Sequence, residues 1–436
     1  MAFWNWRRGV SSPNDRPAHP VFSKKQDAQT SGHASHLPAF EETVSGTTRN
    51  VRANPLRARM RRAFTPSQPV SDLRMFAGRQ DLLRSIIRAI ETQHLHVVLY
   101  GDRGIGKTST LHVLSELAIR AGYLVRYTSS GENSNFDEIF RSVLAEVPFL
   151  YHSDFDPAAG QAEGDSTFSS TLPATPLSVA DVTRVMGKLT GTRLLVILDE
   201  FDRCESVGFR RSMAELIKNL SDRSLPVQIV IGGVAGNLSE LLEYLPSIRR
   251  NVIGLPMPSM SPDELKEIVQ IGSSLSGLPY NPDAIALIAA SANGSPYLGS
   301  LLGQHAGVAA LDRGGDAVNR KDVKAAIALA LREMELRIST ESLHAIRNVT
   351  DPTLRSVLIT LASETLTTIG RINADCGTGH HDQIDRADLE RLDLEHGLIE
   401  RFASADGIGY RFRDQSAPLL IWLRGLHYGQ DPKALT

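Results

Sequence analysis

The sequence predicts an α/β fold: a mostly parallel sheet core, then an all-helical module, then a winged helix. Two patterns support this. Between residues 72 and 256, short apolar segments alternate with segments of helical apolar spacing. From 262 to 339 helical patterns follow one another with no strand between them. Because strands that alternate with helices form parallel sheets, we expect helices on both faces of the core sheet.

The core strands are predicted at 96–100, 123–127, 193–200 and 227–233. A helical stripe over 81–92 precedes the first strand, and a second helical stripe follows it. The segment 152–177 is rich in Ser, Thr, Pro, Gly and Ala, and we expect a long surface loop there.

The helical module is predicted from four segments, 262–277, 282–291, 296–311 and 321–339. Several begin near Pro and end at Gly or Asn, which is typical helix punctuation. Further along, helices are expected at 353–363, 366–374, 386–396 and 417–425. Strands at 398–403 and 409–412 flank Asp406-Gly407, a hairpin signal, so three helices and a ribbon predict a winged helix.

Composition excludes several classes of protein. The chain has 436 residues, 42% hydrophobic and 22% charged, which is close to the globular average. No apolar run approaches the roughly 18 residues that a membrane span needs. Two cysteines cannot build a disulfide scaffold, and the N-terminus lacks the apolar stretch of a secretory signal, so we expect a cytoplasmic protein.

Residues 1–70 contain 11 basic and 4 acidic residues, a net charge of +7, within a chain of net charge −2. The segment is polar and shows no sustained apolar period, so we expect a disordered basic arm. Such an arm is either an anchor on nucleic acid or an acidic surface, or only a solubilising tail.

Residues 101–108 read GDRGIGKT, the pattern G-x-x-x-x-G-K-[ST], between a predicted strand and a predicted helix. Gly101, Gly104 and Gly106 let the backbone turn its N–H groups toward phosphate oxygens. Lys107 would reach the β- and γ-phosphates, and Thr108 would offer its hydroxyl to Mg²⁺. The predicted phosphate-binding residues are Gly101, Asp102, Arg103, Gly104, Ile105, Gly106, Lys107, Thr108 and Ser109.

The strand LLVILDE places Asp199 and Glu200 at its carboxyl end, some 90 residues after the phosphate loop. Asp199 would hold the Mg²⁺ shell, and Glu200 would act as general base for a water that attacks the γ-phosphate. Without the phosphate loop, the pair would be only a polar strand end.

With GDRGIGKT, ILDE, a four-helix module and a winged helix, the chain resembles the AAA+ ATPases over roughly residues 72–428. More narrowly, it is similar to the branch of origin-recognition initiators and STAND-type signalling ATPases. The resemblance implies ATP and Mg²⁺ as ligands, a core over 71–255, a lid over 256–340 and a winged helix over 341–428.

The resemblance also implies further site residues. FAGRQDLL (76–83) matches a segment that closes on adenine, mostly by backbone contacts; its candidates are Phe76, Gly78 and Arg79. An ordinary helix start is the alternative. Asn237 is the nearest polar residue to a family position that senses the γ-phosphate, unless it only caps a helix from 238.

In the family an arginine at the subunit edge completes a neighbour's site, which would be Arg249 or Arg250 here; solvated surface arginines are the alternative. Relatives carry a nucleotide-contacting arginine in the lid, where this chain has Gly294-Ser295-Pro296-Tyr297. Pro296 is then the candidate contact at this turn, which is more like the STAND branch, and the missing arginine implies slow turnover.

Residues 341–436 hold 10 basic and 14 acidic residues, a net charge of −4, and the third winged-helix segment is acidic. A phosphate backbone would be repelled there, although Arg401, Arg411 and Arg413 leave contact through the wing open. Packing on the ATPase body or binding a protein is favoured. Cys376, His380 and His381 are too few ligands to favour a metal over a polar loop.

Three functions follow. The favoured one is an ATP-driven, STAND-like switch that self-associates through a trans arginine and acts on an unknown protein partner, as in a defence response. The second is a DNA-handling ATPase of initiator or loader type that uses the basic arm or the wing. The third is a module that holds ATP without useful turnover, which Lys107, Thr108, Asp199 and Glu200 together oppose.

Overall fold

The computed structural model describes residues 55–156, 166–235, 238, 248–367, 372–373, 384–404 and 407–429. They belong to one compact unit that begins at Asn54. Every helix in this described part is too short or too polar to cross a membrane.

A five-stranded parallel sheet forms the core, with strand order β2-β3-β4-β1-β5. Its strands are β1 (His96–Tyr100), β2 (Leu124–Ser129), β3 (Leu194–Asp199), β4 (Val227–Gly233) and β5 (Val252–Pro256). All residues of β3 and β4 are buried, because helices cover both faces. The parallel sheet predicted from the sequence is confirmed.

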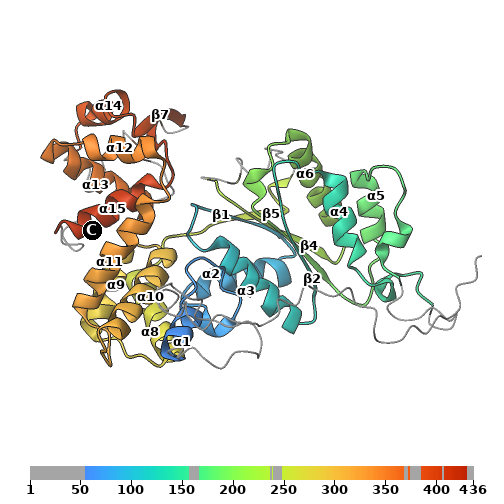
Figure 1. Ribbon diagram of the computed structural model, residues 1–436. Helices are drawn as coiled ribbons and strands as arrows, with labels where there is room; N and C mark the ends of the chain where they lie inside the picture. The colour runs from blue at the N-terminus through green and yellow to red at the C-terminus, as the bar shows by residue number, and fades with distance from the viewer. Residues whose placement is uncertain are drawn as a thin grey trace, which may run out of the picture. The chain divides into compact units, whose positions relative to one another are not determined.

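Helices lie on both faces of the sheet (Figure 1), and each face has its own apolar core. One face is covered by α2 (Gln80–Glu91) and α3 (Lys107–Arg120). The other is covered by α4 (Phe136–Ala145), α5 (Val179–Met186) and α6 (Val207–Asp222). Short 3₁₀ turns occur at Leu73–Met75, Phe149–Tyr151, Phe168–Thr171 and Phe201–Arg203. Phe168 is buried, so the segment expected as a surface loop partly packs into the core.

The lid consists of α8 (Pro262–Ser276), α9 (Pro282–Ala292), α10 (Pro296–Asp312) and α11 (Arg320–Glu335). Proline occupies the first turn of α8, α9 and α10, where its missing N–H costs no hydrogen bond. Ser261 and Asn319 form capping boxes at the starts of α8 and α11. The four helices predicted for this module are present.

The prediction of a disordered arm is wrong for residues 55–70. Pro55–Ala63 forms α1, and Met60 and Phe64 are fully buried against the lid. These two side chains are large enough to fill a groove whose walls are glycines. A Cβ at Gly303 would lie 2.4 Å from the Phe64 ring, and one at Gly307 would lie 2.5 Å from Met60. Residues 1–54 lie outside the described residues.

The C-terminal elements differ in part from the expected ones. They are α12 (Thr340–Asn348), α13 (Pro352–Thr367), β6 (Ile372–Asn373), α14 (Arg386–Leu394), β7 (Ile399–Ser404), β8 (Gly407–Phe412) and α15 (Ala417–His427). The helix predicted at 366–374 is wrong, because α13 continues to Thr367 and Ile372–Asn373 pairs with β8. The α12 helix was not predicted. The order of helices, with a three-stranded sheet β6-β8-β7, is consistent with a winged helix.

The C-terminal domain packs on the lid. Trp422 is fully buried and donates from Nε1 to the carbonyl of Ser291 on α9 at 2.7 Å. Asn293, just after α9, donates to the carbonyl and hydroxyl oxygens of Ser363, each at 3.0 Å. The two helical modules therefore share one apolar core.

Candidate nucleotide site

The phosphate loop connects β1 to α3 through glycines in the left-handed region. The φ angles are +79° at Gly104 and +98° at Gly106, and Lys107 begins α3. A Cβ at Gly101 would lie 3.1 Å from the carbonyl oxygen of Met257, so the loop also runs close to the chain after β5. The glycines of the motif thus serve both the turn and the close packing.

Lys107 is folded back onto its own loop. Its ammonium group donates to the carbonyls of Gly101 at 2.8 Å and Asp102 at 2.6 Å. Burial lowers the pKa of Lys107 to about 8, because the charged form is desolvated. The hydrogen bonds described for this buried cation go to neutral carbonyls, so a phosphate would supply a negative charge that these carbonyls lack.

Asp199 lies at the end of β3 and is only 2% exposed. Its Oδ2 accepts a hydrogen bond of 2.7 Å from the hydroxyl of Tyr127 on β2, and its Oδ1 accepts one of 2.8 Å from the backbone of Glu200. Burial, with the bond to Asp199, raises the pKa of Tyr127, so the phenol stays a donor. His112 stacks on the Tyr127 ring at 4.6 Å. The carboxylate is therefore held in one orientation, in part by Tyr127, which the sequence pattern did not single out.

Glu200 has a φ of +52°, a left-handed conformation that non-glycine residues rarely adopt. Its carboxylate accepts a hydrogen bond of 2.8 Å from Arg203, three residues later. Both side chains are about half exposed and line the same cavity, so solvent screening keeps this ion pair weak. Arg203 was also missed, since only the structure shows that the turn after β3 brings it back to Glu200.

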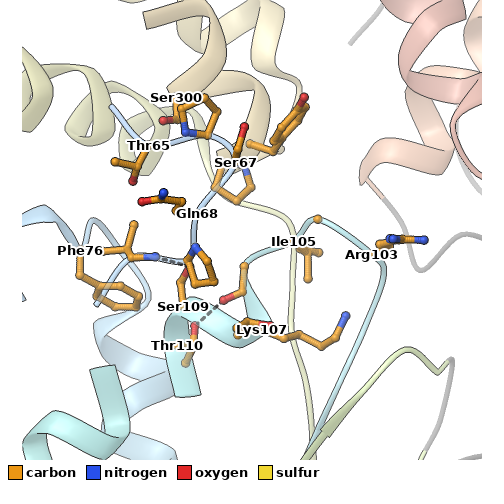
Figure 2. A pocket seen from close by; sticks show the side chains of 18 of the residues that line it. Thr65, Ser67, Gln68, Phe76, Arg103, Ile105, Lys107, Ser109, Thr110 and Ser300 are labelled. Carbon is orange, nitrogen blue, oxygen red and sulfur yellow. Dashed lines mark hydrogen bonds between the residues drawn. The ribbon is translucent and has the colours of Figure 1, made fainter. Parts of the chain in front are cut away.

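A cavity of about 660 Å³ lies beside the phosphate loop (Figure 2). It is bordered by the core and by the lid. Of the residues predicted from the sequence, it is lined by Phe76, Arg79, Arg103, Gly104, Ile105, Gly106, Lys107, Thr108, Ser109, Asp199, Glu200 and Pro296. Gly101, Asp102 and Gly78 do not line it. The structure thus brings together most of the predicted nucleotide and metal ligands.

Residues 64–70, here called the strap, form one wall of this cavity. The strap runs from Phe64, buried in the lid, to Val70, whose backbone N–H donates to the Ser109 hydroxyl at 3.0 Å. In Figure 2, Thr65, Ser67 and Gln68 lie on the side of the cavity opposite Lys107. The strap therefore links the lid directly to the first turn of α3. Sequence reasoning missed the strap, because its contacts depend on residues of the lid that are distant in the chain.

Arg79 connects the phosphate loop to the lid. Its side chain donates to the carbonyl of Ile105 at 2.9 Å, while its backbone N–H and that of Gly78 donate to Glu264 at 2.7 Å and Glu267 at 2.9 Å. Lid carboxylates thus accept from both backbone N–H groups, and the contact of Gly78 and Arg79 with a base stays a prediction. Burial lowers the pKa of Arg79 to about 10. Among the described residues its Nη1 is buried and has no hydrogen-bond partner, as expected of a group that awaits a ligand.

The cavity is bordered by more than the core. Pro296, Tyr297 and Ser300 of the lid helix α10 line it, and so does Gln415, just before α15 of the C-terminal domain. The core, the lid, the C-terminal domain and the strap therefore all contribute residues to one site.

Among the described residues, the two predicted arginines of the subunit edge do not line this cavity. Arg249 and Arg250 lie on an exposed turn before β5, and Arg250 is 3.7 Å from Asp222. Asn237, Cys376, His380 and His381 lie outside the described residues. In the part of the chain that the structure describes, no group of three or more His, Cys, Asp or Glu side chains could hold a metal. A Mg²⁺ ion at this site would use Thr108, Asp199 and the oxygens of a bound nucleotide.

The parallel sheet with a phosphate loop after β1, an acidic pair after β3 and a helical lid define a P-loop NTPase of the AAA+ type. The model of the family "Novel STAND NTPase 1" matches residues 62–307, which is more than half of the chain. The chain belongs to this family, which confirms the STAND branch of the resemblance.

Solved structures with a similar fold include the Aeropyrum pernix ORC2 protein, 18% identical, which covers 84% of this chain and 98% of its own with a TM-score of 0.48. The Thermotoga maritima RuvB Holliday junction branch migration motor is 16% identical over 78% of this chain and 93% of its own, with a TM-score of 0.44. No curated protein matches the chain.

Proposed function

We propose that the protein is an ATP-binding and ATP-hydrolysing switch whose nucleotide state controls its assembly or its binding to a partner. The observation that carries this proposal is the composition of the cavity wall. Core, lid, strap and Gln415 of the C-terminal domain all line the one cavity beside the phosphate loop. A ligand that fills this cavity contacts each part, so it can bias their arrangement by its differential affinity.

The described residues also support hydrolysis. Lys107 and the loop N–H groups would bind the β- and γ-phosphates, and Mg²⁺ held through Thr108 and Asp199 would neutralise developing charge. Glu200 would take a proton from the water that attacks phosphorus, while the bond to the leaving diphosphate breaks. The Arg203–Glu200 ion pair is half exposed and weak, so it would open readily when Glu200 takes up this proton.

The proposal is tested by separating binding from turnover. We expect Lys107→Ala to weaken binding of a fluorescent ATP analogue by about tenfold or more, since it removes a charge-assisted contact. Glu200→Gln should keep the affinity and lower the hydrolysis rate by about 10²–10⁴-fold. Glu205→Gln, at an exposed position near Glu200 that does not line the cavity, is the matched control. Equal hydrolysis by wild type and Glu200→Gln would instead support a module that only holds ATP.

The alternative of a DNA-handling ATPase finds little support in the charges of the C-terminal domain. On the wing, Arg411 contacts Glu400 at 2.5 Å, and Arg413 contacts Asp393 at 2.9 Å. Two of the three wing arginines are thus balanced by acids, which reduces their attraction for phosphates. Duplex DNA binding with a steep salt dependence, lost on deletion of residues 1–54, would assign DNA contact to the N-terminal segment and not to the wing.

A further inference from the structure

A second cavity lies in the C-terminal domain, apart from the nucleotide site. Its volume is about 400 Å³, within the range of known ligand sites, and α12, α13 and α15 form its walls. The floor is apolar and includes Ile346, Ile359 and Ile421. No contact described for the nucleotide site involves these residues.

The charge of this cavity is opposite to that of its domain. Its described lining contains three arginines, Arg347, Arg355 and Arg424, and no carboxylate. Residues 341–436 as a whole have a net charge of −4. A positive, apolar cavity within an acidic domain is a local feature, which the average composition does not explain.

The three arginines differ in what they contact. Arg347 pairs with Glu335 at 3.3 Å, and Arg355 donates to the carbonyl of Val349 at 3.0 Å. Arg424 lies over the ring of Tyr428, with its Cζ 5.8 Å from the ring centroid. Its Nη1 is buried, and among the described residues it has no hydrogen-bond partner. A desolvated charged donor without an acceptor is costly, so Arg424 is suited to receive a carboxylate from a ligand.

We propose that this cavity, the arginine pocket, binds an acidic peptide segment of a partner protein. The segment would place an apolar side chain on the isoleucine floor and a carboxylate on Arg424, with Arg347 and Tyr428 at the rim. Arginine and tyrosine are the residues that most often dominate such interfaces. A peptide is favoured over DNA because the apolar floor of the cavity matches an apolar side chain, which a phosphate backbone does not offer.

The test uses the full-length protein and three fluorescein-labelled hexapeptides, EDLFDE, QNLFNQ and EDSGDE, in fluorescence anisotropy. The proposal requires both charge and an apolar side chain, so EDLFDE should bind about tenfold more tightly than either of the others. Arg424→Gln should weaken EDLFDE binding by about tenfold, and the exposed Arg347→Gln by a smaller factor. Arg332→Gln on α11, an exposed arginine outside the cavity, controls for net charge.

Binding of the fluorescent ATP analogue is measured for each variant in a separate experiment. A variant that still binds the analogue is folded. Equal affinity for the three peptides, or unchanged EDLFDE affinity in Arg424→Gln with ATP binding intact, would overturn the proposal. Displacement of EDLFDE by a short DNA duplex would overturn it in favour of a nucleic-acid site.

Discussion

The hydroxyl of Tyr127 donates a hydrogen bond of 2.7 Å to Oδ2 of Asp199, from one strand to its neighbour in the parallel sheet. The other carboxylate oxygen accepts from the backbone of Glu200. The proposed Mg²⁺ carboxylate is therefore oriented before any nucleotide binds. Groups that hold a metal ligand in this way typically change metal affinity by 10–100-fold when removed.

Tyr127→Phe should therefore raise the Mg²⁺ concentration needed for half-maximal ATP hydrolysis by about tenfold. Binding of the ATP analogue in EDTA should change little, because the phosphate loop is untouched. Tyr123→Phe is the matched control, since its hydroxyl contacts Arg193 at 3.1 Å and not Asp199. An unchanged Mg²⁺ dependence in Tyr127→Phe would mean that Asp199 keeps its orientation without the tyrosine.

Two N-terminal deletions separate the strap from the rest of the N-terminal segment. Deletion of residues 1–54 should leave affinity for the ATP analogue unchanged. Deletion of residues 1–70 should lower it and also destabilise the lid by about 3 kcal/mol or more, because burial of Met60 and Phe64 contributes about 1.5–3 kcal/mol each. Anisotropy and thermal melting measure the two effects. If the two deletion variants have the same ATP affinity and the same melting temperature, the strap does not contribute to the site.

Gly232 on β4 lies beside Asp199 and has no room for a side chain. A Cβ there would lie 2.6 Å from Cδ1 of Leu111 and 3.0 Å from Oδ1 of Asp199. Gly232→Ala should cost about 1–3 kcal/mol of stability by overpacking and should slow hydrolysis by moving the carboxylate.

Gly208→Ala on α6 serves as the control for Gly232→Ala, since its new Cβ meets only Ser206 Oγ at 3.8 Å. Thermal melts and hydrolysis rates compare the two variants. Wild-type stability and rate in Gly232→Ala would show that the strand end adapts freely.

His96 at the start of β1 makes stability depend on pH. It is buried, accepts a hydrogen bond of 2.9 Å from the backbone of Ile229, and burial lowers its pKa to about 4 from the ordinary 6.5. Between these values the unfolded chain binds a proton that the folded chain does not, so stability falls as pH drops from 6.5 to 4. Full protonation of this residue in the unfolded chain lowers the free energy of unfolding by about 3 kcal/mol.

Urea unfolding of wild type and His96→Asn between pH 7 and 4 measures this term. The variant should show a lower stability at pH 7 and a flatter decline. Parallel pH profiles for the two proteins would assign the acid sensitivity to other groups.

The local patterns of the chain predict the sheet and the phosphate site well. The short apolar run LLVIL, which ends at Asp199, favours a buried strand, and GDRGIGKT constrains both its loop and its neighbours. Lys107, Thr108, Asp199 and Glu200 could therefore be proposed from the sequence, and all four line one cavity in the structure.

The strap could not be predicted because its folded conformation is stabilised by residues that are distant in the chain. PLRARMRRA is strongly basic, and the following TPSQPV is polar, so neither segment predicts a packed element. Both segments pack because a groove between α8 and α10 receives Phe64 and Met60. Three glycines leave the space for these side chains, Gly272, Gly303 and Gly307. No local period reveals such complementarity.

The prediction of a helix at 366–374 in the C-terminal domain was wrong for a related reason. Leu366 continues α13, and Ile372–Asn373 instead completes a sheet with β8. A short strand of this kind is defined by its partner, which lies some 35 residues further along the chain, so the apolar residues alone fit either structure.

In the proposed function, nucleotide state controls the assembly of this protein. The most direct test is its mass by light scattering without nucleotide, with ADP, and with ATP bound to Glu200→Gln, which should retain ATP. We expect a larger species with ATP only, and we expect Arg249→Ala or Arg250→Ala to abolish it without loss of ATP binding. A monomer in every state would contradict the trans arginine and control of self-assembly by ATP.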